Sequence, residues 1–436
     1  METESKAFKL PENLLLGVAT AATQIEGGDR NNNWYEWAEK GGAKDKSSPF
    51  RANNHWELWQ QDIQLMSDMH IQIYRMGLEW SRIEPEQGKF SEDAVNRYRD
   101  EIKLLQEKNI KVLVTIQHFN TPLWFEKTGG FLRTDAPAFF EDYVRFVIEK
   151  LHDLVDEWIT INEPNVYALG GFLQGIWPPG IKNFGKMCLV YRNMALCHIT
   201  AYRIIHSFYE EKSLSVKVGV ANHLAHFVPL NPKNLMHRFT TWFIKKGFQL
   251  SITDAFARGK FSFPVAKPTF EQKKLYLSGN KNAKYYDFMG INYYARYAVK
   301  AFSYGVHPET PKNDLGWEIY PDGIRALSEY ICKKYKSPIY ITENGTCDAK
   351  DAFRARFIYD HLRKIAESGL PIERYYHWTF IDNWEWAEGE TAPFGLVKLD
   401  FETQERTIRK SGHFYTEIID NHGVTEEMYE KYLKED

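Results

Sequence analysis

Two glutamates follow apolar, β-branched runs in this chain of 436 residues. Glu163 comes after residues 159–162 and precedes Pro164, and Glu343 comes after residues 339–342. A carboxylate is a poor side chain for a strand that faces a core, so each is either a paired structural group or part of a site. Two carboxylates that meet without a cluster of histidines around them suit general acid and nucleophile roles at an acetal. These residues therefore predict the cleavage of a glycosidic bond.

The ends of distant strands meet at one edge of a parallel sheet, and the sequence contains the runs that such a sheet requires. Short apolar runs predict eight strands, at residues 14–22, 71–80, 110–119, 154–162, 216–224, 286–294, 338–343 and 372–383. Helical periodicity appears between them, at residues 91–108, 136–155 and 321–335. In the first of these helices, Ser91 can cap the first turn, and Val95, Tyr98, Ile102 and Leu105 form one apolar stripe.

Eight strands that alternate with helices predict an α/β fold, a (β/α)₈ TIM barrel. We expect a single catalytic domain over residues 1–436, with a core at about 10–415, long rim loops and extra helices. Residues from about 225 to 285 are too many for a simple connection, so we expect a rim insertion between strands five and six. The alternative, a doubly wound open sheet, lacks its usual glycine-rich phosphate-binding motifs here.

Polar and aromatic side chains occur at the ends of almost all the predicted strands. In a barrel, side chains at the carboxyl ends of the strands point into the active site. These candidates are Gln24, Arg75, His118, Asn162, Glu163, Asn292, Tyr294, Glu343 and Trp378, with Glu385 and Trp386 just beyond the last strand. Amides, histidine and glutamate can bind hydroxyls, and tryptophan can stack on a sugar ring. The set predicts a carbohydrate site.

The composition excludes several other classes of protein. A formal net charge of -3 and the lack of a Lys/Arg run argue against nucleic-acid binding. Four cysteines, with no pair at zinc-knuckle spacing, predict reduced thiols in a cytoplasmic protein. We expect no metal and no cofactor. The expected partner is a small-molecule β-glycoside or oligosaccharide, and nothing in the sequence selects or excludes a homo-oligomer.

Two apolar segments need separate interpretation. Residues 14–22 have the look of a short signal peptide, but acidic residues such as Glu12 precede them, so we expect a first strand. No apolar run reaches the roughly 20 residues that span a bilayer, and no stable membrane association is expected. Trp242 and Phe243 could form an exposed rim for an apolar aglycone or a membrane surface. We interpret them instead as packing residues of an amphipathic helix.

Six motifs together resemble those of the family-1 glycoside hydrolases, the retaining β-glucosidase and β-glycosidase group. They are QIEGG, RMGLEWSRI, TINEPN, GINYY, YITENG and WTFIDNWEW. The resemblance extends from about residue 10 to residue 415, with the motifs in the family's order. Each motif alone is weakly specific, whereas the NEP and TENG pair at this spacing is a strong signal.

The resemblance implies roles for the catalytic group. Glu163 would be the general acid/base, and Glu343 would be the nucleophile that forms a glycosyl-enzyme ester. Arg75 and the Tyr294 hydroxyl would hold Glu343 ionised and oriented. Asn292 belongs to the same catalytic group.

The resemblance also implies substrate contacts. Asn162 would bind the sugar 2-hydroxyl, and Gln24, His118 and Glu385 would bind the other hydroxyls of the glycone. The ring would lie against aromatic walls, formed by Trp378, Trp386 and Phe394. Trp317 could line the aglycone site or belong to the core.

The implied function is that of a β-glucosidase-like O-glycosyl hydrolase. It would release β-linked glucose, and also galactose or fucose, from the non-reducing end by double displacement. Glu385 would repel a sugar phosphate, which favours unphosphorylated substrates. Met76 and Phe119 depart from the residues common in the family and leave the aglycone preference open. A transglycosylase that uses the same two glutamates is the alternative. A non-catalytic glycan-binding scaffold is disfavoured because both glutamates are present.

Overall fold

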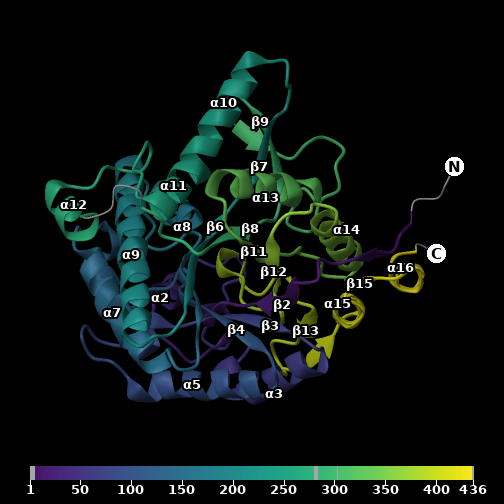
Figure 1. The fold of residues 1–436 in the computed structure, drawn as a ribbon, viewed down its shortest axis with the longest axis horizontal. Helices are drawn as coiled ribbons and strands as arrows, with labels where there is room; N and C mark the ends of the chain where they lie inside the picture. Colours follow the sequence, from purple (N-terminus) through teal and green to yellow (C-terminus); the bar gives the residue numbers. More distant parts are fainter. Residues whose placement is uncertain (1–4, 279–282, 302, 435–436) are drawn as a thin grey trace.

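The predicted apolar runs form a closed barrel of eight parallel strands, so the predicted (β/α)₈ fold is confirmed (Figure 1). The strands are β2 (Leu15–Ala19), β3 (Ile73–Gly77), β4 (Lys111–Gln117), β5 (Glu157–Asn162), β6 (Lys217–His223), β8 (Phe288–Asn292), β11 (Ile339–Asn344) and β12 (Ile372–Trp378). Each pairs with the next barrel strand, and β12 returns to pair with β2. The computed structural model describes residues 5–278, 283–301 and 303–434.

The barrel strands are buried on both faces. In β5, for example, Trp158, Ile159 and Ile161 have no exposed surface, although successive side chains point to opposite sides. Side chains fill the barrel on one face, and helices cover the strands on the other. This double burial is why the strands appear in the sequence as continuous apolar runs rather than as alternating patterns.

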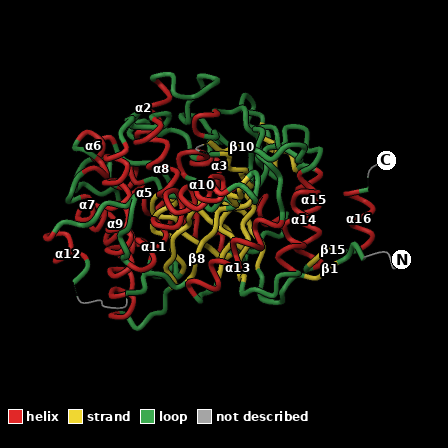
Figure 2. The backbone as a smooth tube through the Cα atoms, turned by 90° about the horizontal axis from the view of Figure 1, so that it is seen from above, coloured by secondary structure: helices red, strands yellow, loops and turns green. Residues whose placement is uncertain are grey.

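Helices surround the barrel, and Figure 2 shows the strands at the centre with helices around them. The main ones are α3 (His55–Asp68), α5 (Glu92–Glu107), α7 (Ala136–Leu151), α9 (Phe184–Glu211), α11 (Ser251–Arg258), α13 (Asp322–Tyr335), α14 (Arg354–Ala366) and α15 (Lys410–Asn421). The predicted cap is present, because the Ser91 hydroxyl accepts a hydrogen bond from the Ala94 N–H at 3.2 Å. Among the described residues, no helix has the length and apolar composition that a bilayer crossing requires.

Additional elements cover the rim of the barrel. Between β6 and β8 lie β7 (His226–Pro229), α10 (Leu235–Lys245), η3 (Lys246–Leu250), α11 and α12 (Phe270–Tyr276). Strand β7 joins β9 (Arg296–Lys300) and β10 (Ser303–Gly305) in a small sheet of order β10-β9-β7. In Figure 1, α10 stands away from the barrel at the top of the view.

Shorter elements complete the chain. They are β1 (Phe8–Lys9), α1 (Ala22–Ile25), α2 (Asn33–Glu39), α4 (Trp80–Ile83), α6 (Leu123–Lys127), η1 (Gly130–Leu132), α8 (Pro164–Ala168), η2 (Leu169–Gln174), η4 (Trp386–Glu388), β13 (Val397–Leu399), β14 (Arg406–Ile408), β15 (Gly423–Val424) and α16 (Glu426–Leu433). Strand β1 pairs with β15, which ties the two ends of the described chain together.

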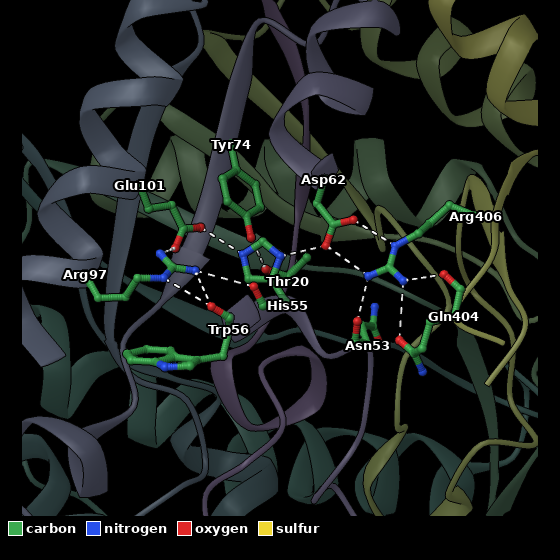
Figure 3. Close-up of polar contacts among 10 residues, drawn as sticks. All are labelled: Thr20, Asn53, His55, Trp56, Asp62, Tyr74, Arg97, Glu101, Gln404 and Arg406. Atoms are coloured by element: carbon green, nitrogen blue, oxygen red, sulfur yellow. Dashed lines mark hydrogen bonds and ion pairs between the residues drawn. The ribbon is translucent and has the colours of Figure 1, made fainter. Parts of the chain in front are cut away.

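A buried cluster of charged side chains joins α3, α5 and β14 (Figure 3). His55 contacts Asp62 through Nδ1 at 2.8 Å and Glu101 through Nε2 at 2.9 Å. Arg97 and Arg406 pair with the same two carboxylates from the outer sides. Burial opposes charge on the imidazole, but the two carboxylates prevail and raise the pKa of His55 to about 10. His55 is therefore the cation at the centre of the cluster.

We expect the substitution His55→Gln to destabilise the fold by about 3 kcal/mol at about pH 6, because it removes a buried cation from two carboxylates. Between its ordinary value of 6.5 and about 10, folded His55 holds a proton that the unfolded chain has lost. The stabilisation is therefore complete below pH 6.5 and is lost as the pH rises towards 10.

Urea unfolding of both proteins at about pH 6 and about pH 9 measures this effect. The difference in unfolding free energy should be smaller at the higher pH. The matched control is His70→Gln, which changes a half-exposed histidine paired with Asp420 and should have little effect. An equal loss at both pH values for His55→Gln would contradict the assignment of the charge.

Candidate active site

A cavity of ≈ 500 Å³ lies at the carboxyl end of the barrel. Nine of the predicted residues line it: His118, Glu163, Tyr294, Trp317, Glu343, Trp378, Glu385, Trp386 and Phe394. The other four predicted residues are fully buried and hydrogen-bond to members of this set: Gln24, Arg75, Asn162 and Asn292. The structure thus brings together every side chain that the sequence assigned to the site.

Glu343 accepts hydrogen bonds at both of its carboxylate oxygens. Arg75 Nη1 donates to Oε1 at 2.5 Å, and the Tyr294 hydroxyl donates to Oε2 at 2.6 Å. Arg75 itself has no exposed surface and also donates to the Thr115 hydroxyl at 3.0 Å. Two fixed donors orient the carboxylate and favour its charged form.

Glu163 lies in a tight turn between β5 and α8. Its backbone is left-handed, with φ 40° and ψ 57°, which is unfavourable for a residue with a side chain. Pro164 then begins α8, at a helix position where the missing N–H costs nothing. The carboxylate accepts hydrogen bonds from Asn292 Nδ2 at 2.8 Å and contacts His223 Nδ1 at 3.2 Å. A strained residue held by such partners is typical of functional sites.

Asn162 and Asn292 connect the two glutamates. Asn162 Oδ1 accepts from Arg75 Nη2 at 2.7 Å and from Asn292 Nδ2 at 3.0 Å. The same Asn292 nitrogen reaches Glu163, and Arg75 reaches Glu343. A continuous chain of hydrogen bonds therefore fixes the position of one carboxylate relative to the other.

The carboxyl groups of the cavity are electrostatically coupled. Burial raises the pKa of Glu343 to about 7, and the negative charge of Glu163 adds to the rise, while Arg75 and Tyr294 oppose it. Burial also raises the pKa of Glu385 to about 8, against a hydrogen bond from Gln24. Arg75 lowers the pKa of Glu343, in the direction that we expected, but this effect is smaller than that of burial. One buried arginine does not offset the desolvation of the carboxylates around it.

Two buried polar atoms of the predicted site residues have no hydrogen-bond partner within the described residues, Gln24 Oε1 and His118 Nδ1. Burial and the charge of Arg75 hold the pKa of His118 well below its usual range, so the imidazole is neutral. Its Nε2 faces Asn162 Nδ2 at 2.9 Å and must accept, which leaves the hydrogen on Nδ1. A donor and an acceptor are thus available for sugar hydroxyls.

Aromatic rings form the walls of the cavity. Trp378, Trp386 and Phe394 line it as predicted, and Trp317 does so as well. The Trp317 ring lies 5.8 Å from Tyr294 and 5.9 Å from Phe394. These contacts place Trp317 at the cavity wall rather than in the core alone.

The sequence interpretation missed His223 and misplaced two other features. His223 is the last residue of β6, so the strand-end rule that found its neighbours also identifies it. Gln24 lies in the short helix α1 rather than at a strand end. The packing interpretation of Trp242 and Phe243 is wrong, because their exposed fractions are 53% and 42%.

The carboxyl end of this parallel barrel holds two glutamates linked by hydrogen bonds, polar atoms that can bind hydroxyls, and aromatic walls. These features together are those of a glycosidase. The chain belongs to glycosyl hydrolase family 1, whose family model matches residues 6–424, and it is therefore an O-glycosyl hydrolase of the β-glycosidase type.

Several relatives cover nearly the whole chain. A 1,4-beta-D-glucan glucohydrolase of Thermotoga neapolitana is 30% identical, over 96% of this chain and 100% of that protein. A β-glycosidase structure from Pyrococcus horikoshii has a TM-score of 0.87 at 35% identity and covers 99% of both chains. The β-glucosidase from Thermotoga maritima in complex with glucoimidazole has a TM-score of 0.85 at 29% identity, and the match covers 95% of this chain and 100% of that one.

We expect hydrolysis that requires the Glu343 carboxylate to slow as the pH falls through about 7, because protonation then removes its charge. The substitution Tyr294→Phe deletes one donor to this carboxylate, so it should move the acid limb of kcat/KM upward by about one pH unit. A pH profile with an aryl β-glucoside measures the limb. Tyr297→Phe is the control, because it changes another tyrosine of the cavity wall. An unmoved limb in Tyr294→Phe would exclude this tyrosine from the control of Glu343.

Proposed function

We propose that the enzyme hydrolyses β-linked glucosides from the non-reducing end with retention of configuration. The observation that carries the proposal is the difference between the two glutamates. Glu343 accepts from an arginine and a tyrosine hydroxyl, whereas the partners of Glu163 are a neutral amide and His223. Unequal surroundings of this kind separate a nucleophile from an acid.

In the first step, an oxygen of Glu343 attacks the anomeric carbon and forms an ester bond. The bond to the leaving oxygen breaks, and Glu163 gives that oxygen its proton. Arg75 and Tyr294 hold the attacking carboxylate in place, since both carboxylate oxygens are already oriented by their donors. The product of this step is a covalent glycosyl-enzyme and the released aglycone.

In the second step, the ester has removed the charge of Glu343, and Glu163 acts as a base. It takes a proton from water, and the water oxygen attacks the anomeric carbon while the bond to Glu343 breaks. The sugar leaves with its original configuration after two inversions. Both carboxyl groups then return to their starting state.

The sugar would be bound by side chains whose hydrogen-bonding atoms are fixed in orientation. Asn162 would contact the 2-hydroxyl, and the unpartnered atoms of Gln24 and His118, together with Glu385, would bind the other hydroxyls. Trp378, Trp386 and Phe394 would stack on the sugar ring. Asn292 would support Glu163 through its hydrogen bond, and Trp317 would lie beside the aglycone. Glu385 supplies no positive charge to pair with a sugar phosphate, and it would repel one when ionised, above its pKa of about 8.

The names of the relatives support glucosides first, because they include a glucan glucohydrolase and β-glucosidases. A β-galactosidase of Pyrococcus woesei, 29% identical over 97% of this chain, supports galactosides as further substrates. We extend the same proposal to fucosides. We also propose that residues 1–436 act as one catalytic domain with a rim insertion at about 225–285. Four free cysteines support a place in the reducing cytoplasm.

We expect Glu343→Ala to reduce turnover by at least about 10⁴-fold, because it removes the carboxylate that would form the ester with the sugar. Added azide should then restore product as the α-glycosyl azide, since a single displacement inverts the configuration. Proton NMR of the product identifies the anomer. A β-glycosyl azide from this variant would remove Glu343 from the nucleophile role.

The variant Glu163→Ala should discriminate between leaving groups. Hydrolysis of a methyl β-glucoside should fall by about 10³-fold, whereas a dinitrophenyl β-glucoside, which needs no protonation, should lose far less in its first step. Azide should give the β-product, because it replaces water after the ester has formed. Steady-state and burst kinetics with both substrates measure the difference. An equal loss for both leaving groups would exclude Glu163 as the acid.

A further inference from the structure

The cavity changes character between its barrel end and its rim. The side chains that helices contribute to it are almost all apolar: Val166, Leu169, Leu173, Met187, Ile244 and Phe248. Gln174 is the polar amide among the residues from these helices. Beyond Glu163, Glu343 and Glu385, the described lining residues include no Asp, Glu, Lys or Arg. The site therefore has a polar inner part and an apolar outer part.

A row of half-exposed rings continues the apolar part to the surface. This aromatic rim comprises Phe184, Phe263, Phe243, Phe239 and Trp242. Phe263 lies 5.8 Å from Phe184 and 6.0 Å from Phe243, and Phe239 lies 6.4 Å from Phe243 and 6.0 Å from Trp242, between ring centroids. Phe184, Phe243 and Phe263 also line the cavity, so the rim and the cavity form one surface.

Most of the large apolar side chains of helix α10 are exposed, although Ile244 packs against a small buried cluster. The buried residues of the helix are Thr240 and Thr241, whereas Phe239 is 55% exposed and Leu235 is 75% exposed. This arrangement is the reverse of an ordinary amphipathic surface helix, which buries its apolar stripe. Contiguous exposed apolar residues on a folded protein mark a binding surface.

We propose that this outer part binds the linear hydrocarbon chain of an amphiphilic β-glycoside, with the sugar at the two glutamates. The proposal rests on the proposed function and names its substrate class. A second sugar in the outer part would place its hydroxyls against side chains that offer few hydrogen-bond partners, which costs free energy. A hydrocarbon chain needs no partner and gains from burial against rings and aliphatic side chains. The apolar outer part is continuous with the active-site cavity, and for this reason we assign it to part of the substrate rather than to another partner.

The chain-length dependence of kcat/KM tests the proposal. With monomeric methyl, butyl and octyl β-glucosides, we expect kcat/KM to rise about twofold for each CH₂ added beyond butyl, less than full burial would give, because the cavity is open at the rim. Octyl glucoside should also be preferred over cellobiose. A flat series, or a preference for cellobiose, would overturn the proposal. Failure to hydrolyse an aryl β-glucoside would instead refute the proposed function itself.

Substitutions at the aromatic rim test whether this surface causes the dependence of kcat/KM on chain length. Phe243→Ser and Phe263→Ser should each lower the octyl-to-methyl ratio of kcat/KM at least about threefold, since both rings line the cavity and are already half exposed. Phe270→Ser is the matched control, because this ring is 84% exposed and does not line the cavity. An unchanged ratio in both cavity variants would overturn the assignment of the chain to this surface.

The hydrocarbon chain could belong to a membrane lipid or to a free amphiphile, and an experiment with lipid vesicles distinguishes these two sources. A long-chain glucoside is presented either dispersed in detergent or embedded in phosphatidylcholine vesicles, with wild type and Trp242→Ser compared. Cleavage in vesicles that falls in Trp242→Ser supports the proposal with a membrane lipid as source. Cleavage of the dispersed form alone supports it with a free amphiphile as source. Cleavage of neither form, alongside normal methyl glucoside hydrolysis, would overturn it. Sedimentation showing a stable dimer across the rim, together with a flat chain series, would assign the surface to a second copy instead.

Discussion

The site depends on one buried guanidinium. Arg75, in the middle of β3, has no exposed surface and donates to groups on three other barrel strands: Thr115, Asn162, and Glu343 with the Thr342 carbonyl. A buried cation is tolerated only when its donors are satisfied, so the strands must hold these acceptors at fixed distances. The planar fork of arginine fits this arrangement, whereas a lysine would supply a single point charge. The barrel strands that hold the partners of Arg75 in place therefore also fix the orientation of Glu343.

Burial and the mutual repulsion of the carboxyl groups, opposed by Arg75 at Glu343, set the proton content of the cavity. Three carboxyl groups share the cavity with Arg75 nearby, and full ionisation would leave an excess of buried negative charge. Burial and mutual repulsion resist this, which is why the pKa values of Glu343 and Glu385 rise to about 7 and about 8. Neutral His118 adds no compensating charge. The same desolvation and repulsion oppose the ionisation of all the carboxyl groups at once, so burial of the site limits how much negative charge the cavity holds.

The sequence predicted the features that depend on local pattern. The eight buried strands appear in the sequence as apolar runs, and Ser91 appears as a helix-capping residue. Glu163 and Glu343 are conspicuous because each follows such an apolar run. The features that were missed depend on tertiary arrangement. Helical periodicity shows that α10 has an apolar side, but not whether that side faces the core, because this is decided by what covers the helix. The position of His223 at the end of β6 was available to the strand-end rule, but its contact with Glu163 was not, because that contact depends on β5 and β6 lying side by side in the barrel.

The two parts of the cavity offer different kinds of interaction to a ligand. The inner part uses hydrogen bonds, which are directional, and a hydroxyl in the wrong place leaves a buried donor or acceptor unpaired. The outer part offers apolar burial, which has no direction and grows with the area removed from water. In the function that we propose, the stereochemistry of the sugar would be recognised at Gln24, His118 and Glu385, whereas the outer side chains would recognise only the length and polarity of the aglycone. Changes in the rim can then alter which aglycones are accepted while the hydrogen-bond chain that orients the two glutamates stays intact.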